Sequence, residues 1–235
     1  MISVPIRAIV TGASRGIGRA IALELASSGA HLALVARRKE PLDMVAEEVS
    51  ALGGFARTFP CDLTRTGTLA DLVERIAAAL GGIDTLINNA GAFDLTPVGE
   101  ADLDRWDHVL DLNLRAVIHL SRHALPHLQR NSCSTIVNVA SVAGKDYLAK
   151  GGIYGASKFG LFGFAGALFE DVRNQGVKVC TIAPGQVAAA RIDGAPPHPS
   201  AAVPAGDIAR VVAFVIGFPA TSCPTEIVLR AQHRA

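Results

Sequence analysis

The sequence has few aromatic residues, no excess of charge of either sign and no long apolar run. Lysine and arginine number 22 against 21 aspartates and glutamates, so the formal charge is only +1. Such a balance provides no strong field to attract nucleic acid or an anionic membrane. The most apolar late stretch, residues 211–218, is too short to span a bilayer, and residues 1–7 lack the apolar core of a signal peptide.

Cysteines are also scarce, and no two of them form a C-x-x-C pair. They stand far apart in the sequence, at Cys61, Cys133, Cys180 and Cys223. This spacing argues against a structural zinc site or a disulfide framework. These absences together predict a cytoplasmic protein that binds neither nucleic acid nor a membrane.

Small and aliphatic residues dominate what is present. Half of the 235 residues are apolar but only 5% are aromatic, and 23 are glycine. A chain this apolar is not disordered. Its length suits one large domain or two small ones.

Strand-like and helix-like segments alternate along the chain. Apolar runs occur at Arg7–Thr11, His31–Ala36, 83–88, 135–140, 177–183 and Glu226–Leu229, and helical periodicity at Leu69–Leu80, 103–129, 154–174 and 205–216. This alternation indicates βαβ units, and continuous apolar runs indicate strands buried on both faces. We therefore predict an α/β fold: one doubly wound Rossmann-type domain over residues 1–235, with a mainly parallel seven-stranded sheet covered by helices on both faces.

A glycine-rich segment follows the first predicted strand and opens the first predicted helix. Its spacing, G-x-x-x-G-x-G, places the backbone close to the positive end of a helix, where a dinucleotide pyrophosphate binds. A tight turn without a ligand is the alternative for the glycines taken alone. The predicted phosphate-binding residues are Gly12, Ser14, Arg15, Gly16, Ile17 and Gly18.

The end of the second predicted strand indicates which dinucleotide is bound. An acidic residue there would favour NAD, but the position holds Ala36, followed by Arg37 and Arg38. Arginine can hold a 2′-phosphate with two hydrogen bonds, so we predict NADP(H) as the cofactor. Solvated loop arginines are the alternative.

Tyr154 and Lys158 lie four residues apart in a predicted helix, so their side chains share one face. A nearby ammonium is expected to lower the phenol's pKa, ordinarily about 10, by about one to three units. Tyr154 would then exchange a proton with a carbonyl or alcohol oxygen. Ser141, at the end of a predicted strand, would hydrogen-bond the same oxygen. For the Tyr-Lys pair alone, an exposed helix pair is the alternative.

These motifs, in this order and spacing, resemble those of the short-chain dehydrogenase/reductase family over nearly the whole chain. The resemblance is nearest to its 3-oxoacyl-(acyl carrier protein) reductase-like members. Further matches are Asp62-Leu63 after the third strand, Asn88-Asn89-Ala90-Gly91 after the fourth, Asn113 in a long helix, and Pro184-Gly185 after the sixth.

The resemblance implies roles for these residues. Asn113 would orient water in a proton relay to Lys158, which would also bind the nicotinamide ribose. The other implied cofactor contacts are Asp62 and Leu63 at the adenine, Asn88, Ala90 and Gly91 along the adenosine ribose, and Pro184, Gly185 and Val187 at the nicotinamide. The alternatives are structural: a helix cap at Asp62, a turn-forming cluster at residues 88–91, and a buried asparagine satisfying backbone at Asn113.

The sequence departs from the family pattern in three places, one of which is the tail after Glu226–Leu229, where the glycine-rich ending common in relatives is missing. Ala189 stands where relatives often carry a threonine that contacts the nicotinamide carboxamide. The segment at about 188–205, where relatives commonly build a lid over the substrate, is short and rich in proline and alanine. We expect a weaker or reoriented cofactor contact and an open or small active-site cover.

The histidines offer a competing site. His119, His123 and His127 repeat at helical spacing, but no third carboxylate falls in register, so we expect a helix face and no metal site.

The leading hypothesis is an NADPH-dependent oxidoreductase that reduces a ketone or 3-oxoacyl carbonyl by hydride transfer, with Tyr154 as the acid. Its partner would be a small carbonyl or acyl-thioester substrate. The long helices at 103–129 and 154–174 carry apolar residues on more than one face, which predicts a homodimer or homotetramer. The alternatives are a non-catalytic NADP(H)-binding protein and an NAD-linked alcohol dehydrogenase.

Overall fold

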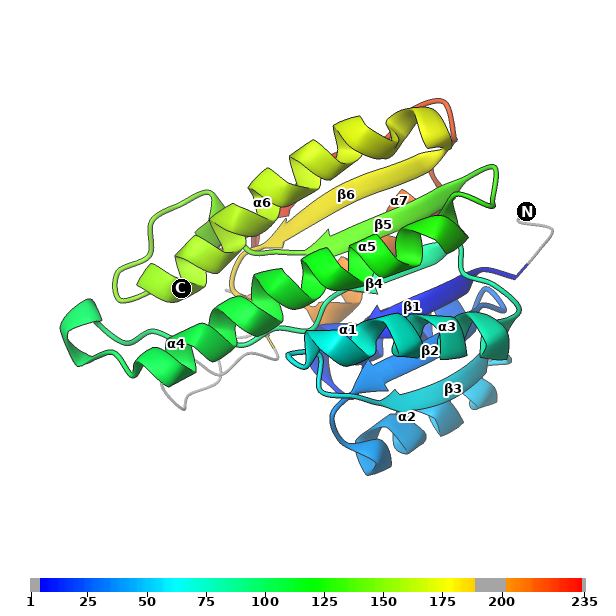
Figure 1. The fold of residues 1–235 in the computed structure, drawn as a ribbon, viewed down its shortest axis with the longest axis horizontal. Coiled ribbons are helices and arrows are strands. Elements are labelled where there is room, and N and C mark those ends of the chain that lie inside the picture. Colours follow the sequence, from blue (N-terminus) through cyan, green and yellow to red (C-terminus); the bar gives the residue numbers. More distant parts are fainter. Residues whose placement is uncertain (1–4, 189–201, 234–235) are drawn as a thin grey trace.

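A seven-stranded parallel sheet forms the centre of the protein in a computed structural model that describes residues 5–188 and 202–233 (Figure 1). The strand order is β3-β2-β1-β4-β5-β6-β7, and every neighbouring pair is parallel. The strands are β1 (Arg7–Thr11), β2 (His31–Ala36), β3 (Phe55–Pro60), β4 (Thr85–Asn88), β5 (Ser134–Val139), β6 (Val177–Pro184) and β7 (Glu226–Leu229). This confirms the predicted doubly wound Rossmann-type architecture.

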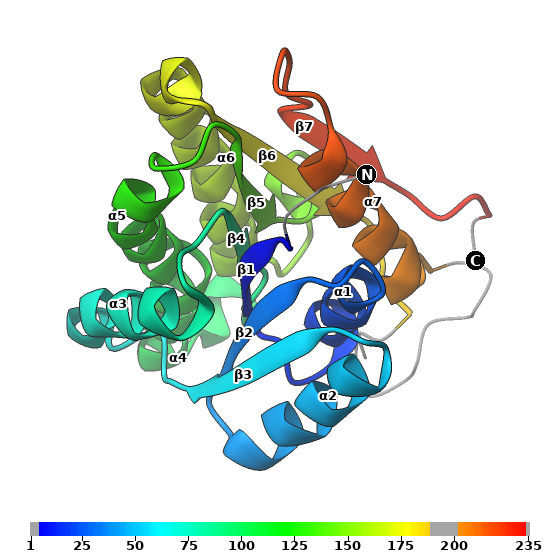
Figure 2. The ribbon, with the colours of Figure 1, turned by 90° about the vertical axis from the view of Figure 1, so that its right-hand side faces the viewer.

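Helices cover both faces of the sheet, three on each side (Figure 2). One face carries α1 (Gly16–Ala26), α2 (Lys39–Ala51) and α7 (Ala205–Gly217), and the other carries α3 (Leu69–Leu80), α5 (Ala116–Leu128) and α6 (Gly152–Val172). Short 3-10 turns lie at Thr66–Thr68, Val98–Glu100, Val142–Gly144 and Arg173–Gln175. Among the helices of the described ranges, none is long and apolar enough to cross a membrane.

The central strands supply both layers of the core because successive side chains point to opposite faces. In β1, Ala8 and Val10 pack with α1, α2 and α7, whereas Ile9 packs with α3, α5 and α6. Every residue of β6 is buried, while the edge strands β3 and β7 alternate between more and less exposed positions. Continuous apolar runs therefore marked the interior strands, as expected for a sheet covered twice.

The predicted helix over 103–129 consists of three consecutive pieces. It begins with α4 (Leu103–Leu110), passes through a single π-helical turn at Asp111–Arg115, and continues as α5. Asp102 caps the start of α4, because its side chain accepts a hydrogen bond from the Arg105 amide at 3.2 Å. The π turn contains Asn113, and such turns often occur at functional sites.

The amino ends of the strands are closed by charged side chains that the protein satisfies itself. Lys178 of β6 is buried and donates to the carbonyls of Val215, Ile216 and Phe218 at the end of α7. Arg7 of β1 pairs with Asp84 at 3.1 Å and also donates to the Gly81 carbonyl and the Asn131 side chain.

The carboxyl ends of the strands all lie at the opposite edge, and the arrowheads in Figure 1 point to it together. The chain leaves β1 toward α1 on one face and leaves the adjacent β4 toward α4 and α5 on the other. Such a switch in direction opens a crevice at the ends of the two strands, which is where α/β proteins bind ligands.

Candidate active site

The glycine loop after β1 has the backbone shape that the sequence predicts. Gly12 and Gly16 adopt positive φ values of 65° and 57°, which favour glycine. A Cβ on Gly18 would lie 2.3 Å from the Gly12 carbonyl oxygen, so only glycine lets α1 begin this close to β1. A Cβ on Gly16 would meet nothing within 4 Å among the described residues, and Arg15 at the N-cap of α1 makes no side-chain cap. The start of α1 therefore has free space beside Gly16 and backbone amides that no capping side chain binds.

Thr11 joins the glycine loop to the loop after β4. Its hydroxyl donates to the Ile87 carbonyl at 3.1 Å and accepts from the amides of Asn89 and Ala90 at 2.9 and 3.0 Å. The Asn89 side chain in turn donates to the Thr11 carbonyl at 2.8 Å. These bonds fix the two walls of the crevice relative to each other, a role the sequence analysis did not assign to either residue.

Asn88 turns its side chain into the sheet. Its amide is buried and donates to Asn138 of β5 at 2.9 Å and to the Ser121 hydroxyl of α5 at 3.4 Å. This arrangement matches the structural alternative for the side chain. A contact of Asn88 with a cofactor would come from its backbone.

The three arginines predicted to hold a 2′-phosphate are exposed beside the crevice. Within the described part of the chain, Arg15, Arg37 and Arg38 form no ion pair with an acidic side chain. Their guanidinium groups are therefore available to an anion from outside the protein.

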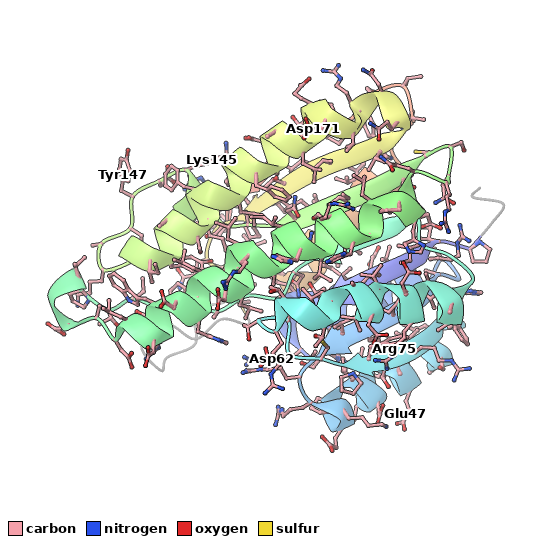
Figure 3. The ribbon with its side chains drawn as sticks, viewed as in Figure 1. Glu47, Asp62, Arg75, Lys145, Tyr147 and Asp171 are labelled. Atoms are coloured by element: carbon pink, nitrogen blue, oxygen red, sulfur yellow. The ribbon has the colours of Figure 1, made fainter. Side chains whose placement is uncertain are left out.

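Asp62 lies after β3, at the carboxyl edge of the sheet (Figure 3). Its carboxylate accepts from the Thr64 amide and hydroxyl at 3.1 and 2.8 Å, so it closes the turn that follows. Burial alone would raise its pKa, but the Thr64 bonds and the charges of Arg37 and Arg65 outweigh burial and hold the pKa below its usual value. Leu63 is buried in the core beneath the turn.

Ser141 and Tyr154 meet at the ends of β5 and α6. The Ser141 hydroxyl accepts from the Ala143 amide at 3.1 Å, which holds the turn after β5 in place. Burial raises the pKa of Tyr154, and a hydrogen bond with Ser141 offsets part of that rise. The prediction that Lys158 lowers this pKa is wrong for the protein alone, because removal of the phenol from water is the larger effect.

Lys158 is buried one helical turn from Tyr154. Its Nζ donates to the Val139 carbonyl at 3.1 Å and lies 5.7 Å from the centre of the Tyr154 ring. Burial lowers the pKa of Lys158 to about 8. The ammonium has three donors, and this is its one hydrogen bond to a described residue.

The π turn places Asn113 against the loop after β4. Its Oδ1 accepts from the Ala92 amide at 2.7 Å, and its Nδ2 donates to the Ala92 carbonyl and the Ser157 hydroxyl at 2.9 and 3.0 Å. A Cβ on Gly91 would lie 3.2 Å from Asn113 Oδ1 and 3.9 Å from Lys158 Nζ, so these three residues come together. Both Nδ2 donors of Asn113 and one lone pair of its Oδ1 are thereby used.

The sequence and the fold of this chain match those of a known protein family. Residues 7–196 match the model of the short chain dehydrogenase family. The chain belongs to this family. It is similar to an uncharacterized oxidoreductase of Staphylococcus epidermidis, with 30% identity covering 95% of this chain and 96% of the relative.

Solved structures of short-chain dehydrogenases superpose over almost the whole chain. A metagenomic short-chain oxidoreductase in complex with NADP is 36% identical, with a TM-score of 0.86 and 97% of both chains covered. A Burkholderia cenocepacia short chain dehydrogenase in complex with NADP is 33% identical, with a TM-score of 0.88 and 96% of both chains covered. The short-chain dehydrogenase is thus an oxidoreductase by family.

After β6, the chain of this short-chain dehydrogenase forms a short parallel bridge with the segment before α7. The Gly185 amide donates to the Leu229 carbonyl at 2.7 Å, which ties the motif after Pro184 to β7. Val187 then pairs with Val203, with bonds from Ala188 to Val203 at 3.0 Å and from Val203 to Gln186 at 2.7 Å. Ala189 and most of the predicted segment at 188–205 lie outside the described residues.

The histidine alternative finds no support. His127 is buried and hydrogen-bonds Glu74 at 2.9 Å, and the rings of His119 and His123 are 6.2 Å apart. Over residues 5–188 and 202–233, no three histidine, cysteine or acidic side chains are placed to hold a metal ion. Tyr147, the other tyrosine, stacks on Phe159 and points away from the protein (Figure 3).

Proposed function

We propose that this short-chain dehydrogenase is an NADP(H)-dependent reductase of ketones, among them 3-oxoacyl carbonyls, with Tyr154 as the general acid. The observation that carries the proposal is the meeting of Ser141, Tyr154 and Lys158 at the carboxyl edge of the sheet, beside an open glycine loop. A binding protein has no need for a proton donor at this place.

The cofactor side of the crevice fits a phosphorylated dinucleotide. The open space at Gly16 and the uncapped first turn of α1 suit a pyrophosphate. The arginines at 15, 37 and 38, which form no ion pair within the described residues, suit a 2′-phosphate. The NADP complexes of two relatives above 30% identity agree with this choice. The reduced nicotinamide supplies the hydride.

The remaining cofactor contacts follow the family resemblance. Asp62 and Leu63 would border the adenine through the turn that Thr64 closes. The backbone of Asn88, Ala90 and Gly91 would run along the adenosine ribose. Pro184, Gly185 and Val187 would bound the nicotinamide.

Tyr154 delivers a proton to the carbonyl oxygen during reduction. Because burial raises the pKa of Tyr154, the phenol stays protonated near neutral pH, which is the form that an acid catalyst needs. The Ser141 hydroxyl, hydrogen-bonded to the tyrosine, orients the same oxygen. The raised pKa favours reduction over oxidation, since oxidation would need the phenolate.

Lys158 lies beside Tyr154, and Asn113 lies near Lys158 at Gly91. Two donors of the Lys158 ammonium remain for a ribose hydroxyl and a water molecule. Because Ala92 and Ser157 already occupy the Asn113 amide, a water relay to Lys158 would use the Asn113 backbone carbonyl. The π turn supports this role, since it breaks the regular helical pairing of carbonyls there.

The proposal is tested by following NADPH and NADH oxidation with a 3-oxoacyl thioester and a panel of simple ketones. We expect turnover with NADPH, and a decrease of about 10³-fold in kcat for Tyr154→Phe with the Kd for NADPH kept. Tyr147→Phe is the matched control and should leave kcat unchanged.

The alternatives give different results in the same assay. Cofactor binding without turnover over the whole panel would identify a non-catalytic dinucleotide-binding protein. An NAD-linked alcohol dehydrogenase would bind NAD more tightly than NADP before any change, and Arg37→Asp would then leave its preference unaltered. Either result would overturn the proposed reductase.

We also propose that the protein self-associates as a homodimer or homotetramer through α4, α5 and α6. Ile118 of α5 and Phe159 of α6 are exposed apolar side chains on the helices for which the sequence predicts such contacts.

A further inference from the structure

The loop between β4 and the turn at Val98–Glu100 buries an acidic side chain and exposes the aromatic side chain next to it. Asp94 is only 1% exposed, whereas Phe93 beside it is 42% exposed. Burial of a carboxylate and exposure of a phenyl ring both oppose folding unless other interactions compensate. Contacts with neighbouring residues must therefore hold this loop in place.

Asp94 anchors the loop from one side. One carboxylate oxygen accepts from the Thr96 amide at 2.8 Å, and the other forms an ion pair with Arg105 Nε of α4 at 2.6 Å. The buried charge is thus compensated by both a backbone amide and a guanidinium. The residue after Phe93 is fixed to α4 as a result.

Asn113 anchors the loop from the other side. It bonds both the amide and the carbonyl of Ala92, the residue before Phe93. The backbone of Phe93 is therefore held on both sides by contacts with the continuous helix formed by α4 and the π turn: Arg105 binds the residue after it and Asn113 binds the residue before it. These anchors restrict where the backbone of Phe93 can place its ring.

The Phe93 ring is held against Tyr154. The two ring centres are 4.7 Å apart and the planes are inclined at 73°, an edge-to-face contact. Phe93 thus adjoins the proposed acid and still exposes a large part of its surface. A substrate whose carbonyl oxygen meets the Tyr154 hydroxyl can therefore place one of its two substituents against this ring.

We propose that Phe93 is a specificity-determining residue that selects ketones carrying an apolar, preferably aromatic, group beside the carbonyl. This inference rests on the proposed ketone reductase function and adds the substrate class. The substituent covers the exposed part of the phenyl ring, so its burial favours binding in the orientation that brings the carbonyl to Tyr154. A polar substituent gains nothing from this contact.

The test compares two ketones in each variant: acetophenone, which has an aromatic substituent, and ethyl acetoacetate, which has a polar ester. The measured quantity is the ratio of their kcat/KM values in Phe93→Ala and Phe93→Leu. Both ketones use the same tyrosine and cofactor, so any change in Tyr154 or in NADPH binding cancels in the ratio. Phe93→Ala should lower the ratio about tenfold, and Phe93→Leu, which keeps an apolar side chain, about threefold.

Phe214→Ala is the matched control. Phe214 is 55% exposed and makes an edge-to-face contact with Phe218 at 5.3 Å, on α7 away from Tyr154. This variant should leave the ratio unchanged. Circular dichroism confirms folding in each case, and the leucine variant carries the test if the alanine variant does not fold.

The outcomes separate the two proposals. If the wild-type protein reduces ketones but both Phe93 variants keep its ratio, the inference about Phe93 is overturned and the reductase function stands. If the wild-type protein binds NADPH and reduces neither ketone nor any other on the panel, the reductase function fails and the inference fails with it.

Discussion

The two ends of the sheet each bury a lysine, and the two lysines differ in how completely the protein satisfies them. Lys178 at the amino end and Lys158 at the carboxyl end are both 5% exposed. Lys178 donates to three carbonyls, whereas Lys158 donates to one among the described residues. The two lysines thus differ in spare hydrogen-bonding capacity and not in burial, and this difference fits a structural role for Lys178 and the chemical role proposed for Lys158.

Arginines at the amino and carboxyl ends of the sheet differ in the same way as the lysines, in how far the protein itself satisfies their hydrogen bonds. Arg7 at the amino end uses its guanidinium on Asp84, Gly81 and Asn131. Arg37 at the carboxyl end is exposed, and in the described ranges no carboxylate forms an ion pair with it. The contrast between Arg7 and Arg37 fits the proposal that ligands bind at the carboxyl end of the sheet.

Replacement of the open lysine should have the largest effect, and the effect should fall on activity. Lys158→Met is expected to lower kcat about 10³-fold, because it removes the charge behind Tyr154 and the donors that remain for the ribose. Steady-state kinetics with NADPH checks this. Activity within threefold of the wild type would mean that Lys158 is a structural lysine like Lys178.

The same lysine should give the free energy of unfolding a distinctive pH dependence. In the folded protein the pKa of Lys158 is about 8, below its ordinary value of 10.5. Between these pH values the unfolded chain binds more protons, so the stability conferred by this site rises with pH by about 3 kcal/mol across the window. Lys158→Met should be the more stable protein at pH 7, and its advantage should disappear by about pH 10.5.

Denaturant unfolding of both proteins from pH 7 to 10.5 measures this difference. A constant gap between the two curves would show that the pKa of Lys158 is not depressed.

Replacement of the satisfied lysine should affect stability alone. Lys178→Met leaves the last carbonyls of α7 without their donor, and we expect a loss of about 2 kcal/mol in the free energy of unfolding. Thermal unfolding should then shift down by about 6 °C, with kcat per folded molecule unchanged. A loss of kcat at full stability would break the comparison.

The smallest effect is expected at the exposed arginines. Arg37→Ala should raise the Kd for NADPH about tenfold at low salt and change the Kd for NADH much less, because only NADPH carries the 2′-phosphate. Fluorescence titration measures both constants. Arg173→Ala is the control, because it removes an exposed arginine that pairs with Glu170 of α6. An equal effect of Arg37→Ala on the Kd values of the two cofactors would argue against a 2′-phosphate contact.

The sequence predicted the parts of the protein whose signals are local. The glycine loop, the interior strands and the Tyr154–Lys158 pair each follow from a short pattern, and the structure contains all three elements. The strand at Phe55–Pro60 had no predicted range, since an edge strand alternates exposed and buried residues and lacks a continuous apolar run.

What the sequence could not predict depends on residues far apart in the chain. The direction of the Tyr154 pKa shift follows from burial, which the spacing to Lys158 does not show. The commitment of the Asn113 amide to Ala92 and the three carbonyls around Lys178 join segments 21 to 40 residues apart. The exposed position of Phe93 likewise needs both anchors of its loop to be seen together.

The pairing of Val187 with Val203 bears on how the fold tolerates changes in the length of the chain between these two residues. The two residues bring the ends of the intervening chain together at a bridge. Chain inserted between ends that already meet adds little loop entropy, about 0.6 kcal/mol for each doubling of length. A longer segment between Val187 and Val203 would therefore cost the fold little additional entropy, because the two residues already meet beside β6.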